Sequence, residues 1–167
     1  AETEPANRSH RIDPHMDPDS IFVSIASYRD DECAPTILDM YTRALRPQSL
    51  YLGIVEQHDP HAGDPPCIPK ELSRKVGGCP PDSKFCPADN MRVTFVNPKD
   101  AKGPTFGRYY GMLMYRGEKY FMMIDSHNRF VRGWDLVAIN MLRMLPPRSV
   151  LSHYPESWDR ADPNFNF

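Results

Sequence analysis

An acid and a histidine two positions apart stand directly after an apolar run, and these residue types can bind a metal ion or a phosphate. The run covers residues 120–124 and stops at Asp125, Ser126 and His127. Continuous apolar residues predict a strand that is covered on both faces of a parallel sheet. Because α/β sheets bind ligands outside the carboxyl ends of their strands, we expect a metal or phosphate site at Asp125 and His127.

Arg108 is expected at the same edge of the sheet. Gly103, Pro104 and Thr105 predict the start of a helix. A helix between two parallel strands begins near the carboxyl edge, so Arg108 in its first turn should lie beside Asp125. An arginine can donate two hydrogen bonds to a diphosphate and keeps its charge. Together these residues predict a diphosphate that is held with a divalent ion and stabilised as a leaving group.

Asp125 and His127 are the predicted protein ligands of that ion. A carboxylate with an imidazole favours manganese over magnesium and calcium, which prefer oxygen ligands. Two protein ligands leave the coordination shell incomplete, so we expect phosphate oxygens and a further protein group to complete it. His153, at the end of a predicted last strand, is a candidate for this further ligand. The alternative is that the Asp-x-His sequence forms a solvated turn.

Polar residues also follow the first two predicted strands, where they can contact a nucleoside. Ser27, Tyr28 and Arg29 follow the first strand, and Glu56 and Gln57 follow the second. Tyr28 and Arg29 can instead cap and pack against the next helix. The sequence thus predicts a nucleotide site along one edge of the sheet.

Alternating strands and helices predict an α/β fold with a mostly parallel, Rossmann-type sheet. Strands are expected at 21–25, 50–55, 91–96, 120–124 and 149–152. Three helices are expected because apolar residues recur at helical spacing. Their predicted buried faces are Ala34, Ile37, Leu38, Tyr41, Ala44 and Leu45; Phe106, Tyr109, Tyr110, Leu113 and Met114; and Trp134, Val137, Ala138, Met141, Leu142 and Leu145.

The chain is expected to form one domain at residues 21–158, between an extended arm at 1–20 and a tail at 159–167. Its 167 residues can bury one core, and its 40% hydrophobic and 25% charged residues are ordinary for a globular protein. A formal net charge of -2 provides no basic surface for nucleic acid.

A proline-rich segment at 60–90 is longer than ordinary connections, so it should be functional or pinned by cross-links. The four cysteines are Cys33, Cys67, Cys79 and Cys86. They predict disulfides of a secreted or lumenal protein, with three possible pairings. A zinc site at His58, His61 and Cys67 is the alternative, but its spacing matches no closed structural site.

Three stretches carry a family resemblance. They are the segment IFVSIASYRD at 21–30, then Gly103-Pro104 with Arg108, then IDSH at 124–127 followed by Phe130 and Trp134-Asp135. In this order they resemble the GlcNAc-transferring polypeptide glycosyltransferases, which include the enzymes that modify hydroxyproline on Skp1 and those that begin O-glycans on threonine in trypanosomatid mucins. The Asp-Ser-His sequence is also similar to the metal motif of the polypeptide GalNAc transferases.

The resemblance implies a GT-A fold, a UDP-GlcNAc donor and transfer, with retention of configuration, to a serine, threonine or hydroxyproline hydroxyl of a protein. It implies manganese bound partly by Asp125 and His127, donor contacts from Ser126, and no protein nucleophile. It also places a tryptophan beside the donor, which makes Trp134 a candidate contact, although a core position is the simpler interpretation.

The same resemblance implies the Golgi lumen, reached through a membrane anchor outside this chain, with the cytoplasm as the alternative. Because the catalytic domains of the family are longer, we expect this chain to hold the nucleotide-binding part. Two other functions remain open. One is a shortened, non-catalytic domain that binds a nucleotide sugar or a glycoprotein, and the other is a metal-dependent hydrolase of nucleotide sugars.

Overall fold

The computed structural model describes residues 17–154 and 156, which form an α/β fold with a parallel sheet. The predicted tail at 159–167 and most of the predicted arm at 1–20 lie outside the described residues. No helix in the described part of the chain has the length and apolar character needed to cross a membrane. The strands and α-helices are β1 (Ile21–Tyr28), α1 (Cys33–Arg43), β2 (Leu50–Gln57), β3 (Met91–Phe95), α2 (Pro104–Met112), β4 (Tyr120–Asp125) and α3 (Trp134–Arg143).

The sheet has the strand order β3-β2-β1-β4, and all neighbouring strands are parallel. Ile21 of β1 pairs with Leu50 on one side and with Tyr120 on the other. The chain therefore adds β2 and β3 on one side of β1 and then crosses to the opposite side for β4. Such a reversal is a topological switch point, and α/β sheets bind ligands at the carboxyl ends of the two strands that flank it.

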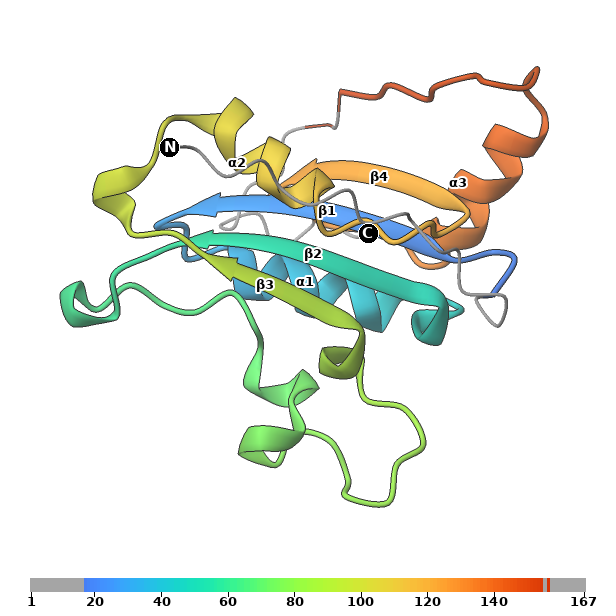
Figure 1. Cartoon of the computed structure of the whole chain (residues 1–167). Helices are drawn as coiled ribbons and strands as arrows, with labels where there is room; N and C mark the ends of the chain where they lie inside the picture. Colours follow the sequence, from blue (N-terminus) through green and yellow to red (C-terminus); the bar gives the residue numbers. More distant parts are fainter. Residues whose placement is uncertain (1–16, 155, 157–167) are drawn as a thin grey trace.

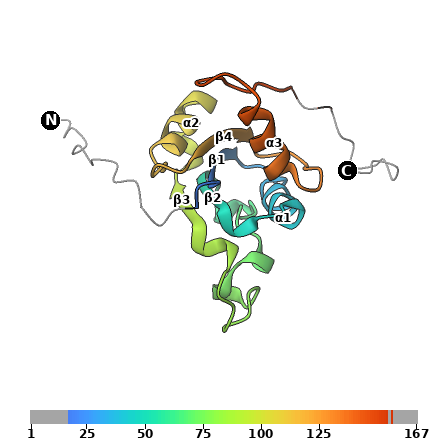
Figure 2. The ribbon, with the colours of Figure 1, turned by 90° about the vertical axis from the view of Figure 1, so that its right-hand side faces the viewer.

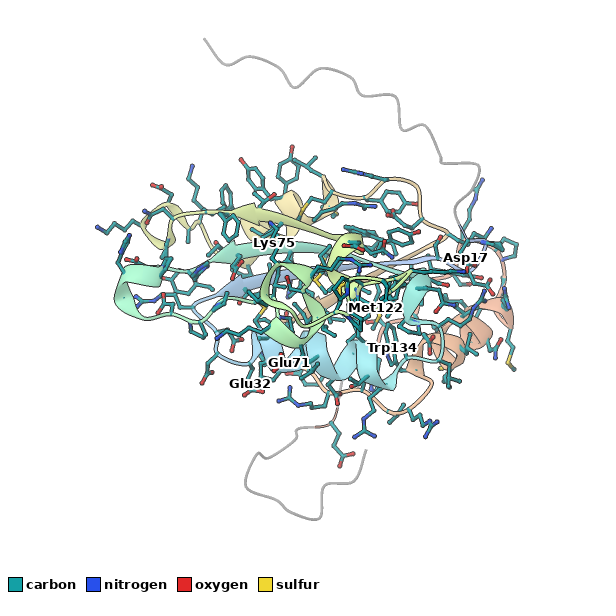
Figure 3. The ribbon with its side chains drawn as sticks, turned by 90° about the horizontal axis from the view of Figure 1, so that it is seen from below. Asp17, Glu32, Glu71, Lys75, Met122 and Trp134 are labelled. Atoms are coloured by element: carbon teal, nitrogen blue, oxygen red, sulfur yellow. A yellow bond between two sulfur atoms is a disulfide. The ribbon has the colours of Figure 1, made fainter. Side chains whose placement is uncertain are left out.

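The main core lies on the face of the sheet that α1, α3 and the 60–90 segment cover (Figures 1 and 2). Alternate residues of β1 and β2, such as Val23 and Leu52, are fully buried there against Ile37 of α1. Trp134 at the start of α3 belongs to the same core, and Met122 of β4 packs against it (Figure 3). Because successive side chains of a strand point to opposite faces, every second residue of β1 and β2 points into this core.

Helix α2 covers the opposite face through two glycines rather than through its predicted apolar face. Gly107 and Gly111 are its buried residues, whereas Tyr109 and Leu113 are exposed. A Cβ atom added to Gly107 would lie 2.9 Å from the Cβ atom of Ala26. The prediction of a buried aromatic face on this helix was therefore wrong, because two glycines one turn apart let the helix backbone approach β1 closely.

We expect the Gly111→Leu substitution to lower the free energy of unfolding by about 2 kcal/mol, because it overpacks this contact. A Cβ atom at position 111 would lie 2.2 Å from Oγ of the buried Ser24. Helix propensity alone predicts the opposite sign, since leucine favours a helix over glycine by nearly 1 kcal/mol. Urea denaturation measures the change, with Met112→Leu on the exposed side of α2 as the control. A stabilised Gly111→Leu variant would contradict the close packing.

Strand β4 is covered on one face only, which corrects the prediction of a strand buried on both faces. Its residues alternate in burial, and Phe121 and Met123 are 42% and 39% exposed. β4 forms an edge of the sheet, and α2 packs on β1 and β2 instead. The apolar run thus reflects an edge strand whose outer face is left partly open.

The fifth strand predicted at 149–152 is absent, since these described residues have no regular structure. After α3 the chain turns at Arg148, which adopts a φ of 68°, and Val150 that follows is exposed. His153 therefore ends no strand and lies exposed in an irregular segment. The predicted buried face of α3 was also misplaced, because Ile139 is buried while Val137 and Met141 are exposed.

The 60–90 segment is pinned by two disulfides, as the cysteines predicted. Cys33 at the start of α1 pairs with Cys67, and Cys79 pairs with Cys86. Because Cys67 is in a disulfide, it does not provide a ligand for the alternative zinc site. The regular structure of the segment consists of short 3-10 turns at Pro60–Ala62, Lys70–Leu72, Arg74–Val76 and Pro87–Asn90.

Candidate functional site

A pocket of about 360 Å³ opens at the carboxyl ends of the strands, on the α2 side of the sheet. It lies at the switch point, because β1 and β4 both contribute to it. Figure 1 shows the arrowheads of β1, β2 and β4 at the same end of the sheet as the start of α2. The lining residues are Ala26, Tyr28, Gln57, Pro98, Ala101, Gly103, Pro104, Arg108 and Asp125.

Arg108 and Asp125 meet across this pocket. A terminal nitrogen (Nη2) of Arg108 lies 2.8 Å from Oδ1 of Asp125, and both side chains are about half exposed. Arg108 begins the second turn of α2, slightly beyond the predicted first turn. The close contact between α2 and β1 brings it over the end of β4. The pocket therefore holds a permanent cation and a carboxylate side by side, within reach of solvent.

Gln57 and Tyr28 line the same pocket from the ends of β2 and β1. Gln57 is 4% exposed, and its amide nitrogen donates a hydrogen bond to the backbone oxygen of Ser27 over 3.3 Å. Its amide oxygen has no hydrogen-bond partner among the described residues. Because a buried acceptor without a partner is unfavourable, this oxygen is suited to accept a hydrogen bond from a ligand.

Asp30, Ser126 and His127 form a second polar cluster after β4. Oδ2 of Asp30 accepts a hydrogen bond from Oγ of Ser126 over 2.6 Å and lies 2.9 Å from Nδ1 of His127. Oδ1 accepts from the backbone nitrogen of Glu32 over 2.9 Å. Partial burial opposes ionisation, but these hydrogen bonds outweigh it and lower the pKa of Asp30 below its ordinary value.

Other predicted site residues lie away from the pocket. Ser27 is buried, and Arg29 forms an ion pair with Asp64 of the 60–90 segment, with 2.9 Å between Nε and Oδ2. Trp134 donates its indole hydrogen to the backbone oxygen of Met40 over 2.9 Å, inside the core on the α1 side. This position agrees with the simpler interpretation of Trp134 as a core residue.

Glu56 also points away from the pocket. It is buried, and its Oε1 accepts a hydrogen bond from the backbone nitrogen of Cys67 over 2.5 Å. The same oxygen lies 3.3 Å from Nδ1 of His58. Glu56 therefore attaches the disulfide-bonded segment to the end of β2.

The donor atoms after β4 fit part of a metal shell. Asp125 offers a carboxylate, and His127 has one ring nitrogen engaged by the Asp30 carboxylate, an arrangement common for metal-binding histidines. Within the described residues, no group of three or more His, Cys, Asp and Glu side chains converges as a metal cluster. Any metal at this place would draw further ligands from the substrate.

The contacts of Asp30 with Ser126 and His127 were not predicted from the sequence, although Asp30 ends the 21–30 segment that carries the family resemblance. Its partners Ser126 and His127 lie 96 and 97 residues further along the chain. Sequence spacing carries no signal for a contact of this range. Pro98 and Ala101 also line the pocket, although the sequence predicted no site residue there.

The model of one protein family, described as Glycosyltransferase (GlcNAc), matches the chain over residues 20–85 and 73–167. These two matches overlap and together run from the start of β1 to the end of the chain. Comparisons with curated proteins and with solved structures gave no significant match. Since the match covers well over half of the sequence and includes the pocket and the Asp-Ser-His motif, this chain belongs to the GlcNAc glycosyltransferase family.

Proposed function

We propose that this chain binds UDP-GlcNAc in the pocket at the switch point and serves the transfer of GlcNAc to a protein hydroxyl with retention of configuration. Membership of a glycosyltransferase family supports glycosyl transfer. The observation that carries the proposal is the pairing of Arg108 and Asp125, 2.8 Å apart, at the pocket where β1 and β4 end. Their charges suit a diphosphate and a divalent cation.

Arg108 is the proposed diphosphate ligand. Its planar guanidinium can donate two hydrogen bonds to phosphate oxygens and remains charged at any physiological pH. The Arg108 side chain is paired with Asp125. On binding, the diphosphate would replace Asp125 as the partner of Arg108, and the metal would replace Arg108 as the partner of Asp125. The protein then holds both charged groups in place before the donor arrives.

A manganese ion is the proposed cofactor, with Asp125 and His127 as its protein ligands. When bound, it supplies positive charge that stabilises the diphosphate as it leaves. A carboxylate oxygen and an imidazole nitrogen suit this metal. Ser126 holds Asp30, which in turn contacts His127, so Ser126 would act on this site through its neighbours.

Tyr28 and Gln57 are the proposed contacts of the uridine. The exposed Tyr28 ring can stack on a base, while the Gln57 amide has an acceptor that lacks a partner among the described residues. Uracil carries a ring N–H flanked by two carbonyl oxygens, which matches an amide. During transfer, the bond between the sugar and the diphosphate breaks and a bond from the sugar to the acceptor oxygen forms. The acceptor proton leaves with UDP, and no protein nucleophile is assigned.

We expect Asp125→Asn to abolish the effect of Mn²⁺ on UDP-GlcNAc affinity without weakening metal-free binding. The amide is a poor metal ligand, but it also releases Arg108 from its ion pair and removes a negative charge beside the diphosphate. Calorimetric titrations with UDP-GlcNAc, with and without Mn²⁺, separate these two effects.

Asp82→Asn is the matched control, since it removes one carboxylate from an exposed position in the 60–90 segment. We expect it to leave both affinities unchanged. If Mn²⁺ enhances binding equally in the wild type and in Asp125→Asn, Asp125 is not a metal ligand.

Transfer is tested with UDP-GlcNAc labelled in the sugar. With a peptide acceptor that contains threonine or hydroxyproline, we expect label on the peptide. Free sugar released without a peptide would instead indicate a hydrolase. Tight binding with neither product would indicate a nucleotide-sugar-binding domain without activity of its own.

We also propose that the protein works in an oxidising compartment, the Golgi lumen. The two disulfides support this location, because such bonds persist in secretory compartments and are rare in the cytosol. The protein acceptors would then be other proteins that pass through the same compartment.

A further inference from the structure

Asp30 lies in the connection between β1 and α1, yet two of the three hydrogen bonds of its carboxylate to described residues reach the segment after β4. Ser126 and His127 both contact the same oxygen, Oδ2, at 2.6 Å and 2.9 Å. The third bond, from the backbone nitrogen of Glu32, engages the other oxygen at 2.9 Å. Both oxygens of this carboxylate are therefore used, and its position is fixed from two elements.

The contact with Asp30 determines which nitrogen of His127 carries the proton. An ionised carboxylate has no hydrogen to donate, so a hydrogen bond to it requires a proton on Nδ1. A neutral His127 bonded in this way has its lone pair on Nε2. A metal needs that lone pair, and partners of this kind commonly set the tautomer of metal-binding histidines.

We propose that Asp30 is a positioning residue that holds His127 in the Nδ1–H tautomer and thereby presents Nε2 to the metal. This inference rests on the proposed function, because it concerns the same metal. Asp30 then belongs to the site, although it neither lines the pocket nor is expected to touch the donor. Ser126 supports the arrangement by donating to the same Asp30 oxygen.

The Asp30→Asn variant tests the proposal with little change in shape. Asparagine keeps an oxygen for the Glu32 nitrogen, which preserves the start of α1. Its NH₂ group then faces His127 and can only donate, so it favours the tautomer with the proton on Nε2. We therefore expect a reversal of the tautomer, together with a loss of Mn²⁺ affinity of about tenfold to a hundredfold in the presence of UDP-GlcNAc.

The tautomer is read from imidazole ¹⁵N chemical shifts in the metal-free chain at about pH 8, where an unperturbed histidine is neutral. A His127→Gln sample assigns the signals among the six histidines of the chain. Manganese affinity is measured by electron paramagnetic resonance with saturating UDP-GlcNAc. Asp31→Asn is the matched control, because it removes the same charge from the adjacent exposed residue. We expect it to preserve both the tautomer and the affinity.

Two results would overturn the role of Asp30 while the proposed function stands. One is an unchanged tautomer in Asp30→Asn, and the other is a reversed tautomer with wild-type Mn²⁺ affinity. If the wild type itself binds no Mn²⁺ with UDP-GlcNAc, the proposed metal site fails, and the role of Asp30 fails with it. Should Asp30→Asn not fold, Asp30→Ser keeps a short acceptor for the Glu32 nitrogen and withdraws from His127, with the same expected loss of affinity.

Discussion

Replacing Arg108 with alanine is expected to weaken UDP-GlcNAc binding about a hundredfold, which corresponds to about 2.8 kcal/mol. The substitution removes two potential charge-assisted hydrogen bonds to the diphosphate, each worth about 1.5 kcal/mol or more. It also removes the cation that is paired with Asp125 at 2.8 Å, which leaves an unpaired carboxylate beside the diphosphate. Isothermal titration calorimetry in Mn²⁺ measures the change.

Two further variants separate charge from geometry at this position. Arg108→Lys keeps the positive charge but loses the planar fork, so we expect an intermediate loss of about tenfold. Arg132→Ala removes an exposed arginine that does not line the pocket, and its affinity should equal that of the wild type. Wild-type affinity in Arg108→Ala would remove this arginine from the site.

Removal of the Cys33–Cys67 disulfide is expected to cost about 4 kcal/mol of stability, the largest loss that we predict. The bond closes a long loop, with a sequence separation of 34, and its loss restores conformational entropy to the unfolded chain. The free energy of unfolding of many domains is only about 5 to 15 kcal/mol, so the double variant Cys33→Ala/Cys67→Ala should melt at a much lower temperature than the wild type. Denaturant unfolding under non-reducing conditions measures the difference.

The second disulfide provides the matched comparison. Cys79 and Cys86 are separated by 7 positions, so the same loop-entropy argument gives Cys79→Ala/Cys86→Ala a loss of only about 2.5 kcal/mol. The longer cross-link also attaches the 60–90 segment to the start of α1, next to the β1–α1 connection that holds Asp30. Equal losses in the two double variants would show that loop length does not set the contribution of these bonds.

Much of the fold follows from local sequence. Short β-branched and apolar runs at 21–25 and 50–55 locate β1 and β2, and helical spacing locates α1 between them. Pro104 marks the start of α2, since the backbone nitrogen of the first helical residue makes no hydrogen bond within the helix. Parallel pairing follows from this alternation, so the shared edge that brings Arg108 to Asp125 could be expected from the chain alone.

The buried side of each element was predicted less accurately than its position in the sequence, because burial depends on which elements lie opposite one another. The apolar run of β4 suggested two covered faces, yet an edge position leaves Phe121 and Met123 partly exposed. In α2 the aromatic side chains suggested the buried face, whereas the contact with β1 requires Gly107 and Gly111. Hydrophobic residues identify an element more reliably than they identify the side that it buries.

The candidate site was predictable where its residues end neighbouring strands. Tyr28, Gln57 and Asp125 meet at the pocket for that reason, and Arg108 reaches it from α2. Glu56 occupies an equivalent place in sequence, but the alternation of side chains along β2 turns it to the opposite face, where it bonds the Cys67 nitrogen. The contact between Asp30 and His127 depends on the tertiary fold, so neither residue alone indicates it.

Calorimetric titration of the wild-type chain with UDP-GlcNAc, with and without Mn²⁺, is the decisive test of the proposed donor site. We expect binding at one site per chain, tighter with Mn²⁺ than without it, and largely lost in Arg108→Ala. Absence of binding under both conditions, or binding of equal strength in Arg108→Ala, would show that this pocket is not the donor site.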